Sequence, residues 1–266
     1  MAQDSMPMRA SFFIVLVISV GVSGIVYALF HWQSHDLLKF ICYLIIAVLG
    51  STMKVKLPGM NSTMSVHFLF ILLGVLELSL GETLVIGCAA AVTQCLWKQK
   101  PELVKLAFNI LGTTSIAIVA TYTAYHGLAG YLNNSMPLLL VVAACACFTA
   151  NTVPIAIIIA LTEGRPLRGI WSETYFWSLP FYLVGVEVVG VLHFSTRYIG
   201  WESGLLVLPI MYWIYRSYHL LFARAPMQPE IDLALEFLHK PTTSELTRWQ
   251  EYAQMLLACD EMLYVG

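Results

Sequence analysis

Two carboxylates lie inside long apolar stretches of the chain, where an ionised side chain is costly. Glu77 lies in the sequence Val-Leu-Glu-Leu-Ser-Leu, and Glu187 lies in Val-Gly-Val-Glu-Val-Val-Gly. A charged side chain at the centre of a bilayer costs about 2.5–3.5 kcal/mol on insertion scales, so such residues face the protein interior and mark functional sites or polar helix contacts. We therefore expect Glu77 and Glu187 to face the interior of a helical bundle, either at a ligand site or as packing contacts.

Histidines gather near the ends of the same stretches, at His31, His35, His126 and His193. Imidazole can titrate near neutral pH, bind a metal or hold a polar ligand, although it also tolerates the headgroup region of a membrane. Only His31 and His35 have the spacing of a metal-binding pair, and they bracket a predicted turn, so we predict no metal site. The candidate ligand-binding residues are Glu77, Glu187, His31, His126, His193, Asn109 and Asn151.

Three prolines lie within the last three apolar stretches, at Pro154, Pro180 and Pro209. Proline inside a helix frees a backbone carbonyl group and bends the helix. Three consecutive bent helices could open a cavity or act as hinges, although static kinks are also common in membrane bundles. Both interpretations of these prolines stay open.

The sequence contains no recognisable catalytic motif. It has no nucleophile elbow, no HExxH and no glycine-rich phosphate loop, so we predict that the chain is not an enzyme and we assign no cofactor and no catalytic residue. The net charge of −2 offers no basic face for phosphates, which argues against a nucleic-acid partner. The six cysteines form no CxxC pair and are interpreted mainly as small buried hydrophobic residues.

The composition predicts a membrane protein. Hydrophobic residues make up 59% of the 266 residues and charged residues only 11%, whereas soluble domains carry about 25% charged residues. Most of the apolar stretches reach the ~20 residues that a helix needs to cross a bilayer. We predict an all-α membrane protein with eight transmembrane helices in residues 1–225 and a helical tail in residues 226–266. The stretches cover residues 11–32, 36–52, 64–80, 82–97, 104–126, 136–162, 170–193 and 203–223.

Two local features concern how these helices pack. The third and fourth stretches, within residues 64–97, are short and are joined only at Gly81. They form either a hairpin that crosses a locally thinned bilayer or a re-entrant pair, and we favour the hairpin. In the first stretch, Gly21-Val-Ser-Gly24 predicts a small-residue packing patch.

Lysine and arginine indicate the orientation, because cytoplasmic loops carry the excess of positive charge. With a cytoplasmic N-terminus and eight crossings, ten basic residues between Arg9 and Arg224 lie inside, and only Lys39 and Arg197 lie outside. Both termini are then cytoplasmic and the loop 127–135 is outside. We expect the membrane to be a bacterial-type inner (plasma) membrane.

The tail contains a predicted amphipathic helix. Thr242-Thr-Ser-Glu245 has the form of a capping box, in which two polar side chains close the N-terminus of a helix. An apolar face at helical spacing follows, and it needs a partner. We predict that it docks on a cytoplasmic or membrane protein or on a second copy of the chain. Its residues are Leu246, Trp249, Ala253 and Leu256.

A more specific pattern runs through residues 51–109. It consists of Lys54-Val-Lys-Leu-Pro-Gly59, Thr63-Met-Ser-Val66, Phe68-Leu-Phe70, Glu77-Leu-Ser-Leu80, Glu82-Thr-Leu84, Gly87-Cys-Ala89, Gln94-Cys-Leu-Trp97 and Phe108-Asn109. This pattern resembles the membrane-spanning N-terminal region of bacterial signalling proteins that carry a GGDEF or HD-type catalytic domain. The resemblance covers about residues 36–224 and implies a sensory membrane module. It does not imply cyclic-dinucleotide chemistry, because the segment 226–266 contains no GGDEF or HD motif.

Three functions are compatible with these features. The first is a sensory or ligand-binding membrane module that passes a signal to a cytoplasmic partner. The second is a transporter or the substrate-binding subunit of one, and the third is a structural subunit of a larger membrane complex. The resemblance and the polar residues near the outer ends favour the first.

Overall fold

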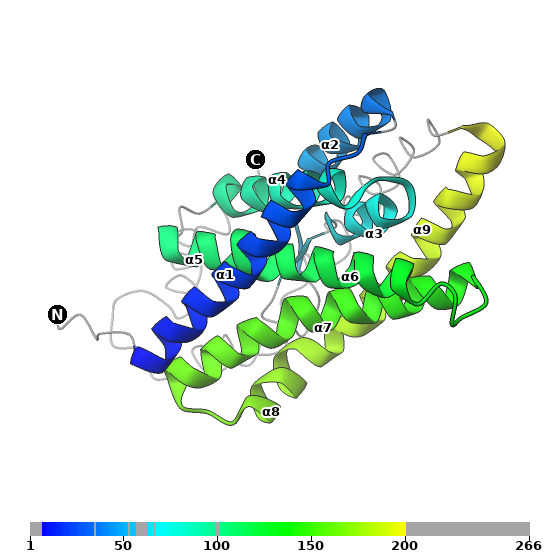
Figure 1. Cartoon of the computed structure of the whole chain (residues 1–266). Helices are drawn as coiled ribbons and strands as arrows, with labels where there is room; N and C mark the ends of the chain where they lie inside the picture. Colours follow the sequence, from blue (N-terminus) through cyan, green and yellow to red (C-terminus); the bar gives the residue numbers. More distant parts are fainter. Residues whose placement is uncertain are drawn as a thin grey trace, which may run out of the picture. The chain divides into compact units, whose positions relative to one another are not determined.

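The computed structural model describes residues 7–34, 36–52, 54–56, 63–65, 67–98 and 102–200 (Figure 1). Several predictions fall outside these ranges. They concern His35, the eighth apolar stretch with Pro209, the domain boundary at residue 225, and the tail residues Leu246, Trp249, Ala253 and Leu256.

The described part of the chain is almost entirely helical, which confirms the all-α class. The α-helices in chain order are α1 (Met8–Phe30), α2 (Leu37–Ser51), α3 (His67–Glu77), α4 (Leu80–Lys98), α5 (Leu103–Ala107), α6 (Ser115–Gly127), α7 (Met136–Glu163), α8 (Leu167–Ile170) and α9 (Leu179–Ile199). A π-helix, η1 (Phe108–Thr114), joins α5 to α6, while a second π-turn, η2 (Trp171–Tyr175), and a 3₁₀ turn, η3 (Phe176–Ser178), join α8 to α9.

One element was not predicted from the sequence, a short antiparallel pair of strands between α2 and α3. Strand β1 (Lys54–Lys56) pairs with β2 (Thr63–Ser65), and Val55 lies opposite Met64. Both strands have three residues, so neither is long enough to show the alternation that identifies a strand in a sequence.

Within the described ranges, three helical segments are long and apolar enough to cross a membrane. They are Met8–Phe30 with 23 residues, Leu103–Gly127 with 25 and Met136–Glu163 with 28. At about 1.5 Å per residue, each exceeds the roughly 30 Å of bilayer hydrocarbon. The remaining apolar helices are shorter, so the described structure is compatible with a membrane protein while the eight-crossing topology stays a prediction.

Large apolar side chains lie both inside and outside the bundle. The interior contains fully buried side chains from five helices: Tyr43, Leu72, Ile86, Leu140 and Val189. On the outside, Phe12 and Phe30 of α1 are 70% and 85% exposed. Exposed apolar surface of this extent is unfavourable in water and is the surface expected against lipid.

The helices pack as neighbours along the chain and across it. Helices α6 and α7, both green in Figure 1, lie side by side, and α9 (yellow) packs against α7 and α3. Helix α2 packs mainly against α4. This arrangement places α2, α4 and α9 around the short helix α3.

The junction between α3 and α4 lies two residues earlier than predicted. The break falls at Leu78 and Ser79, and Gly81 is already in the first turn of α4. Ser79 and Glu82 form a capping box: the Glu82 carboxylate accepts from the Ser79 backbone N–H at 3.0 Å, and the Ser79 hydroxyl accepts from the Glu82 N–H at 3.3 Å. Gly81 instead permits close contact, because a Cβ there would lie 2.7 Å from the Trp32 ring.

Helices α3 and α4 form an antiparallel helical hairpin, a geometry that a hairpin crossing the bilayer and a re-entrant pair share, so the favoured crossing of residues 64–97 stays a prediction. A Cβ at Gly74 would lie 2.9 Å from the Thr83 hydroxyl, and one at Gly87 would lie 3.4 Å from Ile71. These pairs are symmetric about the 78–79 turn, as antiparallel neighbours must be. With 11 residues, α3 extends only about 16 Å, so this helix alone does not span a bilayer of ordinary thickness.

The seventh stretch differs from the prediction of a single helix bent at proline. Pro180 occupies the first turn of α9, where its missing N–H costs no hydrogen bond, and the irregular backbone lies before it in η2 and η3. Pro154, in contrast, lies inside α7, which continues to Glu163 and ends at Gly164 with φ of 67°. The prediction of an interior kink is therefore wrong for Pro180.

Candidate functional site

A group of polar residues from three helices lies where α3 ends, next to the turn that leads into α4. The centre of this group is Glu77, whose side chain is only 3% exposed. Four side chains surround its carboxylate: Lys39 and Tyr43 from α2, and His193 and Thr196 from α9. We call these five residues the Glu77 cluster.

Each oxygen of the Glu77 carboxylate is bound by a different helix. Oε2 lies 2.6 Å from Lys39 Nζ and accepts from the Tyr43 hydroxyl at 2.9 Å, so it is held by α2. Oε1 lies 3.1 Å from His193 Nδ1 and 3.1 Å from Thr196 Oγ1, so it is held by α9. One carboxylate on α3 therefore bridges two other helices.

The chemistry of the cluster defines several proton positions. A carboxylate can only accept, so the His193 Nδ1 atom must carry the hydrogen of the 3.1 Å contact. The Thr196 hydroxyl has one proton and two acceptors within reach, Glu77 Oε1 and the His193 carbonyl oxygen at 2.7 Å. The negative charge of Glu77 is thus compensated mainly by Lys39, and the remaining donors orient it.

The cluster is buried but not sealed. Tyr43 is 2% exposed, whereas the side chains of Lys39 and His193 are 18% and 19% exposed. The Lys39 ammonium and the His193 imidazole therefore lie nearer the surface of the described structure than the Glu77 carboxylate does.

A second buried carboxylate, Glu82, lies just beyond the turn. Besides closing the capping box, it accepts from the Ser34 hydroxyl at 2.7 Å and from the Ser79 hydroxyl at 3.0 Å. Glu82 is 2% exposed. Ser34 belongs to the connection between α1 and α2, so this contact ties that connection to the start of α4 and helps to position α2 beside Glu77.

His126 supports the same turn from α6. Its Nε2 atom lies 3.0 Å from the carbonyl oxygen of Val75, one of the last carbonyl groups of α3, which lack partners inside the helix. The rings of Tyr122 and Tyr125 flank His126 at centroid distances of 4.2 and 5.1 Å. His126 therefore belongs to the neighbourhood of the Glu77 cluster through the backbone of α3.

Glu187 does not face the interior, so the sequence-based expectation for this residue is wrong. The inward face of α9 carries Tyr182, Val186 and Val189, all buried. Glu187 is about 100° further round the helix from Val186 and is exposed, on the same face as Val191 and Phe194. Within the described ranges it forms no hydrogen bond or ion pair.

The other candidate residues lie apart from the cluster. His31 is exposed and its Nδ1 atom bonds the Tyr27 carbonyl oxygen of its own helix at 2.9 Å. Asn109 accepts from the Thr114 hydroxyl at 3.3 Å within η1. Asn151 of α7 donates to the Tyr182 hydroxyl of α9 at 3.4 Å. Of the predicted candidates, only Glu77 and His193 are in direct contact.

Sequence reasoning missed Lys39, Tyr43 and Thr196 as site residues. Lys39 had a signal, because it is one of two basic residues in the predicted outer segments and a buried carboxylate needs a cation. Tyr43 lies one turn after Lys39 on the same face of α2, which is a weaker signal. Thr196 gave none, since a threonine near a helix end usually bonds its own backbone.

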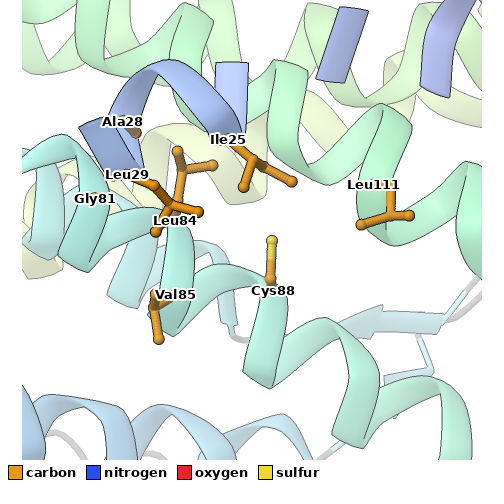
Figure 2. A pocket seen from close by; sticks show the side chains of 8 residues that line it. All are labelled: Ile25, Ala28, Leu29, Gly81, Leu84, Val85, Cys88 and Leu111. Carbon is orange, nitrogen blue, oxygen red and sulfur yellow. The ribbon is translucent and has the colours of Figure 1, made fainter. Parts of the chain in front are cut away.

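An apolar cavity of about 130 Å³ lies between α1, α4 and η1 (Figure 2). Its lining is hydrocarbon except for the thiol of Cys88, which points into it (Figure 2). Apart from that thiol, the side chains that line it provide no polar group for ligand recognition. Its lining residues are Ile25, Ala28, Leu29, Gly81, Leu84, Val85, Cys88 and Leu111.

The described residues contain no group of three or more His, Cys, Asp or Glu side chains placed to hold a metal ion. No protein-family model matches the chain, and no curated protein or solved structure matches it either. The features of the described structure that bear on function are therefore the Glu77 cluster and the helices that it connects.

Proposed function

We propose that the chain is an integral membrane sensory module of a bacterial-type inner membrane, with eight crossings and both termini in the cytoplasm. It binds a ligand near the Glu77 cluster and passes the signal to a cytoplasmic partner through its tail, with no catalytic step of its own. The observation that carries the proposal is the buried carboxylate of Glu77, which connects α2 to α9 by an ion pair and hydrogen bonds.

A buried ion pair is a poor source of net stability, because desolvation offsets most of the attraction. Removing only one partner of the pair is nevertheless costly, because the other partner is left as an uncompensated buried charge. These two properties together suit a switch, in which a cluster is either fully formed or fully broken. A ligand that contacts Lys39 or His193 differently in the two states shifts their populations.

Helix α9 has the features of the element that moves. The first turn of α9 is anchored by Tyr182. The Tyr182 hydroxyl accepts from Asn151 at 3.4 Å, and the Tyr182 ring lies 4.8 Å from the Phe68 ring. The other end of α9 is held by His193 and Thr196 of the Glu77 cluster. The π and 3₁₀ turns before α9 are geometries that often mark hinges, so release of Glu77 lets α9 pivot about Tyr182.

The direction of the signal follows from the order of the elements. After α9 come the last apolar stretch, 203–223, and the tail with its predicted docking face. The resemblance to sensory membrane regions supports the same direction of signalling, from the membrane helices to the tail. The buried Glu77 and the partly exposed Lys39 and His193 also favour a second candidate, a transporter that couples solute movement to a proton or ion, because such groups line relays in transporters.

The proposal is tested by the reactivity of Cys259, a natural cysteine of the tail. In a variant that retains only this cysteine, we expect a membrane-impermeant maleimide to label inverted vesicles but not intact cells. Adding Glu77→Gln should change the labelling rate in inverted vesicles by about five-fold or more, the size of a typical coupling between sites. The matched control is Glu187→Gln, which removes an exposed carboxylate from α9.

The outcomes separate the candidates. Labelling of Cys259 in intact cells contradicts the topology. An unchanged rate in Glu77→Gln, together with loss of solute flux into proteoliposomes, favours the transporter. An unchanged rate with lower thermal stability alone leaves the Glu77 cluster as a packing contact and contradicts the sensory proposal.

A further inference from the structure

We infer that the ligand of this site is a small carboxylate anion, and that Glu77 occupies its place as a tethered competitor. The inference rests on the proposed function and names the ligand class for it. The geometry behind it is the convergence of Lys39 Nζ, Tyr43 Oη, His193 Nδ1 and Thr196 Oγ1 on one carboxylate, at distances between 2.6 and 3.1 Å.

The surrounding groups match a carboxylate in both charge and shape. A cation and a phenol serve one oxygen, and an imidazole N–H and a hydroxyl serve the other. Charge-assisted hydrogen bonds of this kind are short and strong. The carboxylate belongs to the last residue of α3, whereas all four donors come from α2 and α9. These donors can therefore bind a carboxylate that is not part of α3.

The exposure pattern shows the side from which an anion approaches. Lys39 and His193 are partly exposed, at 18% and 19%, while the Glu77 side chain behind them is 3% exposed. An incoming anion meets the two nitrogen donors before it displaces Glu77. Because Glu77 is tethered, its effective concentration is high, so the physiological ligand must add contacts beyond its carboxylate to compete.

Removing the tethered carboxylate should therefore create a site for a free one. Glu77→Ala keeps all four donor side chains and removes the carboxylate and most of the side chain that fills the place between them. We expect sodium formate or acetate at about 100 mM to raise the thermal midpoint of the purified variant by about 3–6 °C relative to equal sodium chloride, the shift for an anion at roughly ten times its Kd. Sodium sulfate, which is tetrahedral and larger, should give a smaller shift.

Three proteins serve as controls for this measurement. The wild-type protein and Glu77→Gln, in which a side chain still fills the place, should not distinguish formate from chloride. Glu187→Ala removes a carboxylate outside the Glu77 cluster and should also show no difference. A second responsive variant, Glu77→Asp, keeps the charge and the fold but holds its carboxylate one methylene short, so we expect an intermediate shift.

The result that overturns the inference is the absence of a formate or acetate effect in both Glu77→Ala and Glu77→Asp. An equal effect in Glu187→Ala also overturns it, because the stabilisation is then unrelated to the Glu77 cluster. Neither result affects the Cys259 measurement, which uses Glu77→Gln without added anion, so failure of the ligand class and failure of the sensory proposal are distinguishable.

Discussion

Glu77→Ala should lower the free energy of unfolding by about 3–5 kcal/mol, the cost of removing one partner from a buried ion pair. The substitution leaves Lys39 close to a buried phenol without its counter-charge and removes the acceptor of His193 Nδ1. It also removes the only group that joins α2 to α9 in the described cluster. For a chain of this length, that loss corresponds to a fall of about 6–20 °C in the thermal midpoint.

Thermal unfolding in detergent, followed by tryptophan fluorescence, measures this effect. Glu77→Gln should fall between the wild-type protein and Glu77→Ala, because its carboxamide oxygen still accepts hydrogen bonds. The matched control Glu187→Ala should change the free energy of unfolding by no more than about 0.5 kcal/mol, as exposed substitutions usually do. Equal midpoints for Glu77→Ala and Glu187→Ala would show that the Glu77 cluster does not hold the helices together.

The second large effect is expected at Gly21, where α1 crosses η1. A Cβ at this position would lie 1.8 Å from the carbonyl oxygen of Leu111, a backbone atom that cannot rotate away. Gly112 faces Val17 of α1 across the same crossing. Gly21→Ala must therefore push two backbones apart, and we expect a loss of about 1–3 kcal/mol or more, the range for overpacked interiors.

Gly190→Ala provides the matched control, because Gly190 is also a glycine inside a long apolar helix. The nearest atom to a Cβ there is Leu140 Cδ1 at 4.0 Å, so the added methyl group fits. Alanine is favoured over glycine in a helix by about 0.5–1 kcal/mol, and we expect a neutral or raised thermal midpoint. A change in thermal midpoint of the same sign for Gly21→Ala and Gly190→Ala would contradict the close crossing of α1 and η1.

The long helices could be predicted from the sequence because their apolar stretches are uninterrupted and their ends are marked. The predicted stretch 136–162 corresponds to Met136–Glu163, and its ends coincide with Pro137 near the start and Gly164 after the last turn. The small residues around Gly21 likewise predicted a packing patch, and Gly21 is at the crossing with η1. The turns η2 and η3 could not be predicted, because no residue type specifies them.

The candidate site was predicted only in part, and the reason is helix rotation. Burial cost alone identified Glu77 and Glu187, but α9 is apolar on all sides, so its sequence does not indicate which face is turned inward. Glu187 and His193 lie on different faces of α9, and only the fold shows that the face with His193 meets Glu77. The contribution of Lys39 depended on α2 lying beside α3, a tertiary contact with no local signature.

The central claim is that Glu77 holds α9 against α2 and that its release moves α9. The most direct test is the distance between spin labels at Ile41 of α2 and Phe194 of α9, two exposed positions outside the Glu77 cluster, in protein reconstituted into bilayers with its native cysteines replaced. We expect one narrow distance distribution with Glu77 intact, and the same distribution in Glu187→Gln. In Glu77→Gln it should broaden and shift by about 2–5 Å, the range of known helix displacements in switches. Superimposable distributions for Glu77→Gln and the parent protein would contradict the account.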